Sequence, residues 1–251
     1  MEHSLTQRQV LDVAITIGCR ILLYGGEANR AEDTVSRIGQ AYGMDEVHVF
    51  AVAASIMVTV EKDGESMTQT RRIVRTNTDL DKLDKFNDLS RLICRERTDF
   101  ATVMSAIKEI DASPVYPWYI MMLAYAIIGS AFAVFFGGGV AEFVVGFVVG
   151  ALIRPVIKLA DYLQSPPFFT NVAGAATTVM LVKLCTFVFV NLNVSATTIG
   201  VLMNLVPGVL LTNCIRDFVA TDYSAGTAKI METLLVAAAI ALGVGVSVLW
   251  R

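Results

Sequence analysis

The sequence predicts a membrane protein in which an α-helical bundle of five transmembrane helices follows a small α+β cytosolic domain. Charge is concentrated at the front, because residues 1–117 contain 14 of the 20 Lys and Arg residues and 18 of the 23 Asp and Glu residues. The rest of the chain consists of long apolar stretches, and a membrane helix needs about 20 mostly apolar residues. We therefore expect a cytosolic domain over 1–112 and a transmembrane domain over 113–251.

The front domain is expected to contain four helices around a small antiparallel sheet. Apolar residues recur at helical spacing over four segments, at 6–23, about 27–42, 79–94 and 98–111. Three β-prone segments lie between the second and third of these helices, at 47–53, 55–61 and 66–74. Asp63-Gly64 between the last two is a strong hairpin signal. A chain of this length can bury a core of its own.

Five apolar segments are expected to cross the membrane, at about 118–136, 140–159, 168–190, 196–215 and 229–250. Trp118 and Tyr119 are suited to anchor the first segment at the interface. Gly146 and Gly150 have the spacing that allows two helices to approach closely. Glu142 is expected in water at the outer end of the second segment.

The distribution of basic residues predicts the orientation. The loops after the second and fourth segments contain Arg154, Lys158, Arg216 and Lys229, whereas the turns after the first and third contain no Lys or Arg. The positive-inside rule makes the basic loops cytosolic. We expect a cytosolic N-terminus without a secretory signal peptide, because its first residues are not apolar. Five is an odd number of crossings, so the C-terminus is expected outside.

The segment 202–217 places polar groups in an otherwise apolar stretch. Pro207 removes a backbone donor and Gly208 tolerates the resulting bend. A helix broken inside a membrane is tolerated only where protein or a watery cavity receives its polar groups. One interpretation is therefore a discontinuous helix beside a transport path, and the other is a helix that ends in cytosolic water. The predicted path is bordered by Asn204, Pro207, Gly208, Thr212, Asn213, Arg216 and Asp217.

Lys183 is also assigned to the predicted path. It lies about 15 residues into the third apolar segment, and a charge near the centre of a membrane helix costs at least roughly 2.5–3.5 kcal/mol. Two interpretations are open. The side chain extends toward the outer interface, or it faces a cavity, where it pairs with an acid or holds a substrate carboxylate.

The stretch from Tyr24 to Thr34 combines a glycine pair with a charged helix start. Backbone N–H groups at a helix start can hold an anion, but acidic residues in the first turn compete for that place. The spacing is not that of a dinucleotide or phosphate loop. One interpretation is a turn and a charged helix start, and the other is a cytosolic gate or docking surface. The gate would consist of Gly25, Gly26, Glu27, Arg30, Glu32 and Asp33.

Other function classes have little support in the sequence. Neither half is basic enough to indicate a nucleic-acid partner. The four cysteines are scattered without a CxxC pair and the chain has only two histidines, so we expect no metal site and no cofactor. No nucleophile–base pair is legible, and we expect neither catalytic residues nor an enzyme.

Three stretches together resemble the threonine/serine exporter family in its split form. Residues 24–34, Tyr-Gly-Gly-Glu-Ala-Asn-Arg-Ala-Glu-Asp-Thr, resemble the family's SGGE-x-x-R-x-E-D-T motif, with Tyr24 where the family often has Ser. Residues 204–217 resemble its PG-x-x-x-T-x-x-x-RD motif. Residues 222–229, Asp-Tyr-Ser-Ala-Gly-Thr-Ala-Lys, are similar to its D-x-x-S-G stretch. The resemblance covers nearly the whole chain.

The resemblance implies a bacterial inner-membrane exporter of small amino acids such as threonine and serine, or of dicarboxylates such as succinate, driven by an ion gradient. Full-length members look like a cytosolic domain and ten spans in two halves, and this chain ends after the first half. It is therefore similar to the YjjP-type subunit, which pairs with a small YjjB-type membrane subunit. The expected partners are this subunit in a hetero- or homo-oligomer, the lipid bilayer, and a small carboxylate or amino-acid substrate.

A second hypothesis belongs to another class. The chain would be a membrane-anchored assembly or sensor protein whose cytosolic domain binds a partner. The size of the front domain supports it, as does the lack of a complete path in five spans.

Overall fold

The computed structural model describes residues 5–74, 78–114 and 116–249. The chain forms two compact units, which are described separately below. The first unit contains Met1–Pro114 and Arg216–Ala228, and the second contains Val115–Ile215 and Lys229–Arg251. The chain therefore returns to the first unit after most of the second has been completed.

The first unit has the order of elements that the sequence predicts. Its elements are α1 (Gln7–Leu23), α2 (Ala28–Ala41), β1 (Glu46–Val52), β2 (Ser55–Lys62), β3 (Glu65–Arg72), α3 (Leu80–Glu96) and α4 (Phe100–Ala112). The sheet is antiparallel with the order β1-β2-β3. Asp63 and Gly64 both have positive φ, 53° and 79°, and Lys62 pairs with Glu65 across them. This is the two-residue hairpin that an Asp-Gly pair favours.

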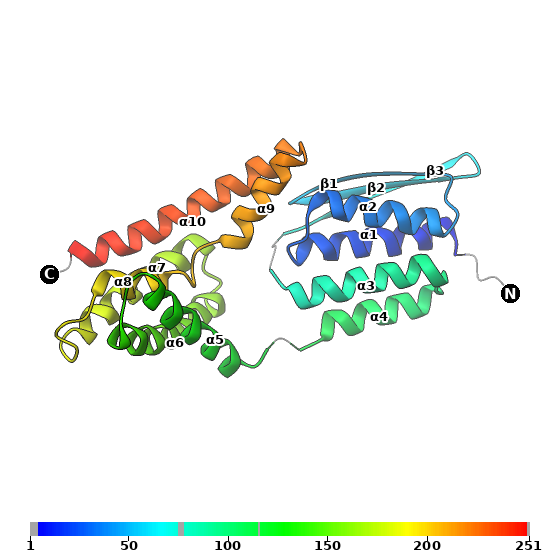
Figure 1. The fold of residues 1–251 in the computed structure, drawn as a ribbon. Coiled ribbons are helices and arrows are strands. Elements are labelled where there is room, and N and C mark those ends of the chain that lie inside the picture. Colours follow the sequence, from blue (N-terminus) through cyan, green and yellow to red (C-terminus); the bar gives the residue numbers. More distant parts are fainter. Residues whose placement is uncertain (1–4, 75–77, 115, 250–251) are drawn as a thin grey trace. The chain divides into compact units, whose positions relative to one another are not determined.

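The core of the first unit surrounds α1. The sheet covers α1 and α2 on one side, and α3 and α4 lie on the other (Figure 1). Ten of the 17 residues of α1 are buried, because α1 contacts the sheet, α2, α3 and α4. Thr6 begins the helix with a capping box, in which its hydroxyl accepts from the backbone N–H of Gln9. Because α1 is enclosed on several sides, the residues that follow its end have a fixed position.

The second unit consists of helices. They are α5 (Trp118–Phe135), α6 (Val140–Tyr162), α7 (Pro167–Cys185) and α8 (Val194–Leu202), followed by α9 (Gly208–Val219) and α10 (Tyr223–Leu249), which extend partly into the first unit. Within the described residues, four helices are long and apolar enough to cross a membrane, namely α5, α6, α7 and α10. The expected fourth span at 196–215 is not a single helix, because the chain breaks between α8 and α9. The expectation of five transmembrane helices is therefore not confirmed within the described residues.

Three other boundaries differ from the sequence-based prediction. α6 continues to Tyr162, so that Arg154 and Lys158, expected in the loop after it, lie within the helix. α7 ends at Cys185, where a continuation to residue 190 was expected, and turns follow it. α10 begins at Tyr223 rather than at 229, because Asp222 accepts from the backbone N–H of Ala225 and caps it. Hydropathy alone does not indicate where α7 ends, since the residues on both sides of 185 are equally apolar.

Small residues bring α5 and α6 into close contact, as the glycine spacing predicts. A Cβ atom on Gly146 would lie 2.8 Å from the carbonyl oxygen of Gly129. One on Gly150 would lie 2.5 Å from the carbonyl oxygen of Tyr125. Both positions therefore exclude any side chain, and backbone contact replaces side-chain packing.

Glu142 is buried, and the expectation that it lies in water is wrong. Its side chain accepts from the backbone N–H of Gly139 at 2.7 Å and from that of Asn193 at 2.7 Å. The residue is only 6% exposed. The first N–H groups of a helix have no partner within the helix, so the carboxylate both caps α6 and fixes the chain before α8.

Candidate functional site

The sequence-predicted break between α8 and α9 is confirmed. α8 ends at Leu202, residues 203–207 form turns, and α9 begins at Gly208. Pro207 has no N–H to donate. Among the described residues, no group donates a hydrogen bond to the carbonyl oxygens of Met203, Asn204 and Leu205. The break therefore contains three consecutive backbone carbonyl oxygens that accept no hydrogen bond from the described residues.

Asn204 ties this break to α5. Its Nδ2 donates to the carbonyl of Val201 at 3.0 Å and to that of Tyr125 at 3.3 Å. Its Oδ1 is buried and has no partner in the part of the chain that the structure describes. The hydroxyl of Thr198, on α8, is buried and unpartnered as well. Buried polar atoms are almost always hydrogen-bonded, so two unmatched oxygens near one break call for an explanation.

The other predicted path residues on α9 have simpler surroundings. Thr212 donates to the carbonyl of Gly208 at 2.9 Å, so its hydroxyl is satisfied within its own helix. Asn213 makes no side-chain hydrogen bond to any described residue. A Cβ atom on Gly208 would meet nothing within 4 Å. Gly208 is therefore not required for packing.

Lys183 lies at the end of α7 rather than in its middle. Its Nζ donates to the backbone carbonyl of Ser247 on α10 at 2.9 Å. The Ser247 hydroxyl donates in turn to the carbonyls of Gly243, at 2.8 Å, and Ala176, at 3.2 Å. A cation in the last turn of a helix is favourable, so these contacts give Lys183 a structural role between α7 and α10.

The glycine pair of the predicted gate ends α1. Gly25 has φ of 91°, and the N–H of Gly26 donates to the carbonyl of Ile21 at 2.8 Å. A Cβ atom on Gly26 would lie 2.5 Å from Cγ2 of Ile21. Both glycines are thus needed to close the helix. This agrees with the interpretation of the stretch as a turn before a charged helix start.

Two acidic residues of the predicted gate have contacts within the first unit. Glu32 accepts from the backbone N–H of Ala51 at 2.7 Å and joins α2 to β1. Asp33 pairs with Arg37, one turn along the same helix, at 3.0 Å. Each carboxylate therefore has a sufficient local partner in the fold.

Glu27 and Arg216 bring the two singled-out stretches together. Glu27 is the N-cap residue of α2 but makes no cap hydrogen bond. Its carboxylate instead pairs with the guanidinium of Arg216, which belongs to the same compact unit. The Glu27 side chain is 23% exposed and that of Arg216 is 58% exposed. Asp217, the next residue, is buried. The accessible guanidinium of Arg216 therefore pairs with the carboxylate of Glu27, and a second acidic residue, Asp217, follows it in the chain.

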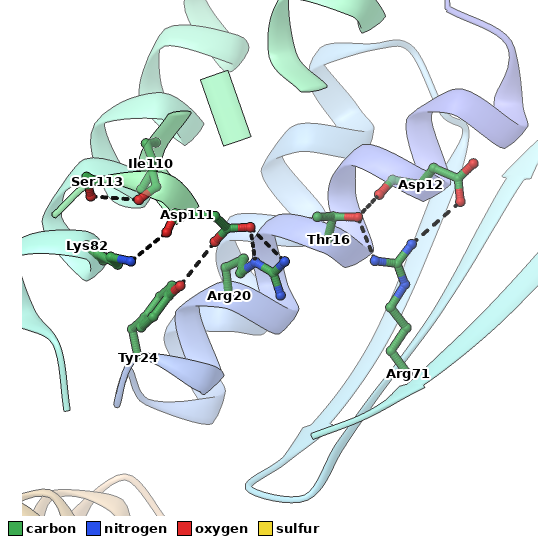
Figure 2. A network of polar contacts seen from close by, with 9 residues as sticks. All are labelled: Asp12, Thr16, Arg20, Tyr24, Arg71, Lys82, Ile110, Asp111 and Ser113. Atoms are coloured by element: carbon green, nitrogen blue, oxygen red, sulfur yellow. Dashed lines mark hydrogen bonds and ion pairs between the residues drawn. The ribbon is translucent and has the colours of Figure 1, made fainter. Parts of the chain in front are cut away.

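A polar network fixes the residue that precedes the glycine pair (Figure 2). Asp111, in the last turn of α4, accepts two hydrogen bonds from the guanidinium of Arg20, at 2.9 and 2.7 Å. It accepts a third from the Tyr24 hydroxyl at 3.1 Å, and its backbone carbonyl accepts from Lys82 at 2.7 Å. Burial and the bond to Asp111 raise the pKa of Tyr24. Tyr24, where the resembled family often has Ser, is thereby locked between α1 and the end of α4.

Sequence reasoning missed Asp111, Arg20 and Thr198. Asp111 and Arg20 are 91 residues apart, and no local pattern connects them. The only signal for Thr198 is a hydroxyl pair, Thr197-Thr198, in an apolar segment. Among the described residues, no three His, Cys, Asp or Glu side chains are grouped so as to hold a metal ion.

Comparison with known proteins gives a consistent result. The sequence profile of the family ThrE, described as "Putative threonine/serine exporter", matches residues 12–249. The chain is 26% identical over 240 residues to "Probable succinate transporter subunit YjjP" of Escherichia coli (strain K12), with 95% of this chain and 93% of that protein covered. It is 24% identical over 248 residues to "Threonine/serine exporter" of Corynebacterium glutamicum.

The coverage differs between these two relatives. The match includes 95% of this chain but 50% of the Corynebacterium glutamicum protein. A relative from Mycobacterium tuberculosis, "Probable threonine/serine exporter", is 23% identical and is likewise covered over 46% of its length. The chain therefore spans about half of the two exporters and nearly all of the relative named as a subunit. No solved structure matches the chain.

Proposed function

Because the chain belongs to the threonine/serine exporter family, we propose that it is one subunit of an inner-membrane secondary transporter for small amino acids or dicarboxylates. Family membership and four apolar helices make it a multi-pass membrane protein. The ion pair between Glu27 and Arg216 carries the proposal. The substrates named for the relatives, succinate, threonine and serine, all contain a carboxylate.

In the proposed mechanism, the substrate carboxylate replaces Glu27 on Arg216. A guanidinium presents a fork of donors that matches a carboxylate, and exchange of one carboxylate for another leaves the charge balance unchanged. Glu27 therefore acts as a gate that keeps Arg216 occupied when no substrate is present. Asp217 attracts the ammonium group of an amino acid or a coupling proton.

The break between α8 and α9 is proposed as the second position on the path at which substrate binds. Gly208 and Arg216 belong to the same helix, so a substrate that leaves Arg216 can follow α9 to the break. There the free carbonyl oxygens at 203–205 and Oδ1 of Asn204 offer acceptors to an ammonium group or a cation. Discontinuous helices in transporters provide such carbonyls at their unwound segments.

The proposed partner is a YjjB-type small membrane subunit. The relative from Escherichia coli is named as a subunit and is covered almost completely, whereas the two exporters are about twice as long. In this proposal, the partner corresponds to the part of the two exporters that lies outside the match. We place the N-terminus in the cytosol and the C-terminus outside, with α8 and α9 together forming the fourth of five crossings.

Efflux from reconstituted vesicles tests the proposal. Vesicles that contain the chain and a short hydrophobic partner protein are loaded with labelled serine, threonine or succinate, and efflux is followed after an ion gradient is imposed. We expect efflux of at least one substrate, and none when either protein is omitted. The double variant Pro207→Ala/Arg216→Ala should abolish it. Unchanged efflux in that variant would remove the proposed path.

A further inference from the structure

A polar groove of about 460 Å³ lies between α2 and α3 in the first unit. Residues 30, 33, 34 and 37 of α2 line one side, and residues 87, 90, 91, 94 and 95 of α3 line the other. Spacings of three and four residues place each set on one face of its helix. Four of the lining residues are arginines, Arg30, Arg37, Arg91 and Arg95.

The charge of this groove differs from that of its domain. Residues 1–117 have a net charge of −4, from 14 basic and 18 acidic residues. The groove contains four arginines and a single acidic residue, Asp33. Guanidinium groups that share a groove repel one another unless negative charge compensates them. A position where an acidic domain concentrates positive charge is therefore suited to an anion.

The acidic residues present compensate this charge incompletely. Arg37 pairs with Asp33, whereas Arg91 and Arg95 pair with neighbours on α3 that do not line the groove. Arg30 forms no ion pair within the described ranges. The side chains of Arg37, Arg91 and Arg95 are 65–75% exposed. Such exposed pairs are weak, so the guanidinium groups can turn toward a ligand at little cost.

The floor of the groove is polar but uncharged. Asn87 and Ser90 are buried, with 6% and 7% exposure. The Ser90 hydroxyl donates to the carbonyl of Asn87 at 2.7 Å. The side-chain amide of Asn87 makes no hydrogen bond to any described residue and is available to a ligand. Apolar side chains would be expected where two helices pack, so this polar lining is unusual for a helix seam.

We propose that this groove binds a small multivalent anion with at least two carboxylate or phosphate groups. The lining carries a net charge of +3, from four arginines and one aspartate. The exposed pairs of Arg91 and Arg95 with Asp88 and Glu96 offset part of this charge only weakly, and several guanidinium groups in one groove suit an anion with more than one charged group. Bidentate contacts to guanidinium groups suit both carboxylate and phosphate. Arg30 follows the gate residue Glu27 by three positions on α2. The site lies on the helix that follows Glu27 and is distinct from the path at Arg216.

Titration calorimetry on the full chain in detergent tests the binding. The probes are succinate, citrate, inorganic pyrophosphate and ATP at constant ionic strength, with chloride as the monovalent control. The variant Arg30→Gln/Arg91→Gln should weaken binding at least about tenfold, since charge-assisted hydrogen bonds contribute roughly 1.5–3 kcal/mol and about 1.4 kcal/mol is tenfold. The matched control Arg8→Gln/Arg72→Gln removes two exposed arginines outside the groove and should change affinity less than about twofold.

Two further comparisons identify the chemical class of the ligand and separate this groove from the transport path. Stronger binding of succinate and citrate identifies a carboxylate ligand, and stronger binding of pyrophosphate and ATP identifies a phosphate ligand. The titrations are repeated with Arg216→Ala, which lacks the proposed substrate site, and binding in the groove should persist there, so that failure of the proposed transport path does not affect this test. An equal loss of affinity in the groove variant and in the control variant would overturn the proposal, as would binding of none of the four anions.

Cysteine alkylation locates the ligand independently. Cys94 lines the groove, whereas Cys19 lies on α1 outside it and serves as the internal control. Burial raises the thiol pKa of both cysteines, so burial slows the alkylation of both thiols. A saturating anion should slow alkylation of Cys94 and leave that of Cys19 unchanged, as followed by mass spectrometry. Equal rates at Cys94 with and without the anion would contradict binding in the groove.

Discussion

If Glu27 competes with substrate for Arg216, then removal of its charge should strengthen substrate binding. Glu27→Gln keeps the size of the side chain and deletes the ion pair with Arg216. Exposed ion pairs contribute about 0.2–1 kcal/mol, and the Arg216 side chain is 58% exposed. A competition energy near the upper end, about 1 kcal/mol, corresponds to about a fivefold lower KM, because 1.4 kcal/mol is tenfold. The maximal rate should fall, since bound substrate then leaves Arg216 more slowly.

Initial efflux rates over a range of internal substrate concentrations measure both quantities. Arg216→Gln should instead raise KM, and the double variant should resemble Arg216→Gln, because the two residues then no longer interact. Asp81→Asn is the matched control, because it removes an exposed carboxylate that pairs with Lys85 on α3. A Glu27→Gln protein with an unchanged or higher KM would refute the competition.

Three further predictions concern stability. Gly208→Ala should leave the unfolding temperature in detergent unchanged, whereas Gly200→Ala should lower it strongly, because the new Cβ would lie 2.3 Å from the backbone nitrogen of Ala133 on α5. Equal effects would contradict close packing of α8 against α5. Glu142→Ala should cost about 1–3 kcal/mol, since it leaves two part-buried N–H groups without an acceptor, and denaturant unfolding measures this loss. Burial raises the pKa of Tyr42 to about 12, while an unfolded tyrosine ionises near about 10. Stability should therefore fall between these two pH values, and Tyr42→Phe should reduce that fall in pH-dependent unfolding.

The front domain could be predicted from local signals. Helical periodicity placed all four helices to within about two residues, which is the ordinary uncertainty of helix ends. The Asp63-Gly64 pair identified the hairpin, because few residues other than Asn, Asp and Gly adopt its positive φ values. Pro207 likewise marked the break between α8 and α9. In each case the deciding chemistry lies within a few residues of the feature.

The features that could not be predicted depend on contacts between distant parts of the chain. An apolar stretch looks the same whether it is a helix or a turn, so Lys183 was expected near mid-helix although α7 ends two residues later. Glu142 is buried because Asn193, far along the chain, donates to it. The pairing of Glu27 with Arg216 joins residues 189 positions apart, and no spacing rule indicates it.

Efflux of labelled substrate by Arg216→Ala, compared with the unaltered chain at equal amounts of reconstituted protein, tests the central claim most directly. A charge-assisted hydrogen bond to a substrate carboxylate contributes about 1.5–3 kcal/mol, so we predict efflux reduced at least about tenfold, with Arg216→Lys intermediate because an ammonium lacks the donor fork. Efflux by Arg216→Ala equal to that of the unaltered chain would show that the substrate carboxylate does not depend on Arg216.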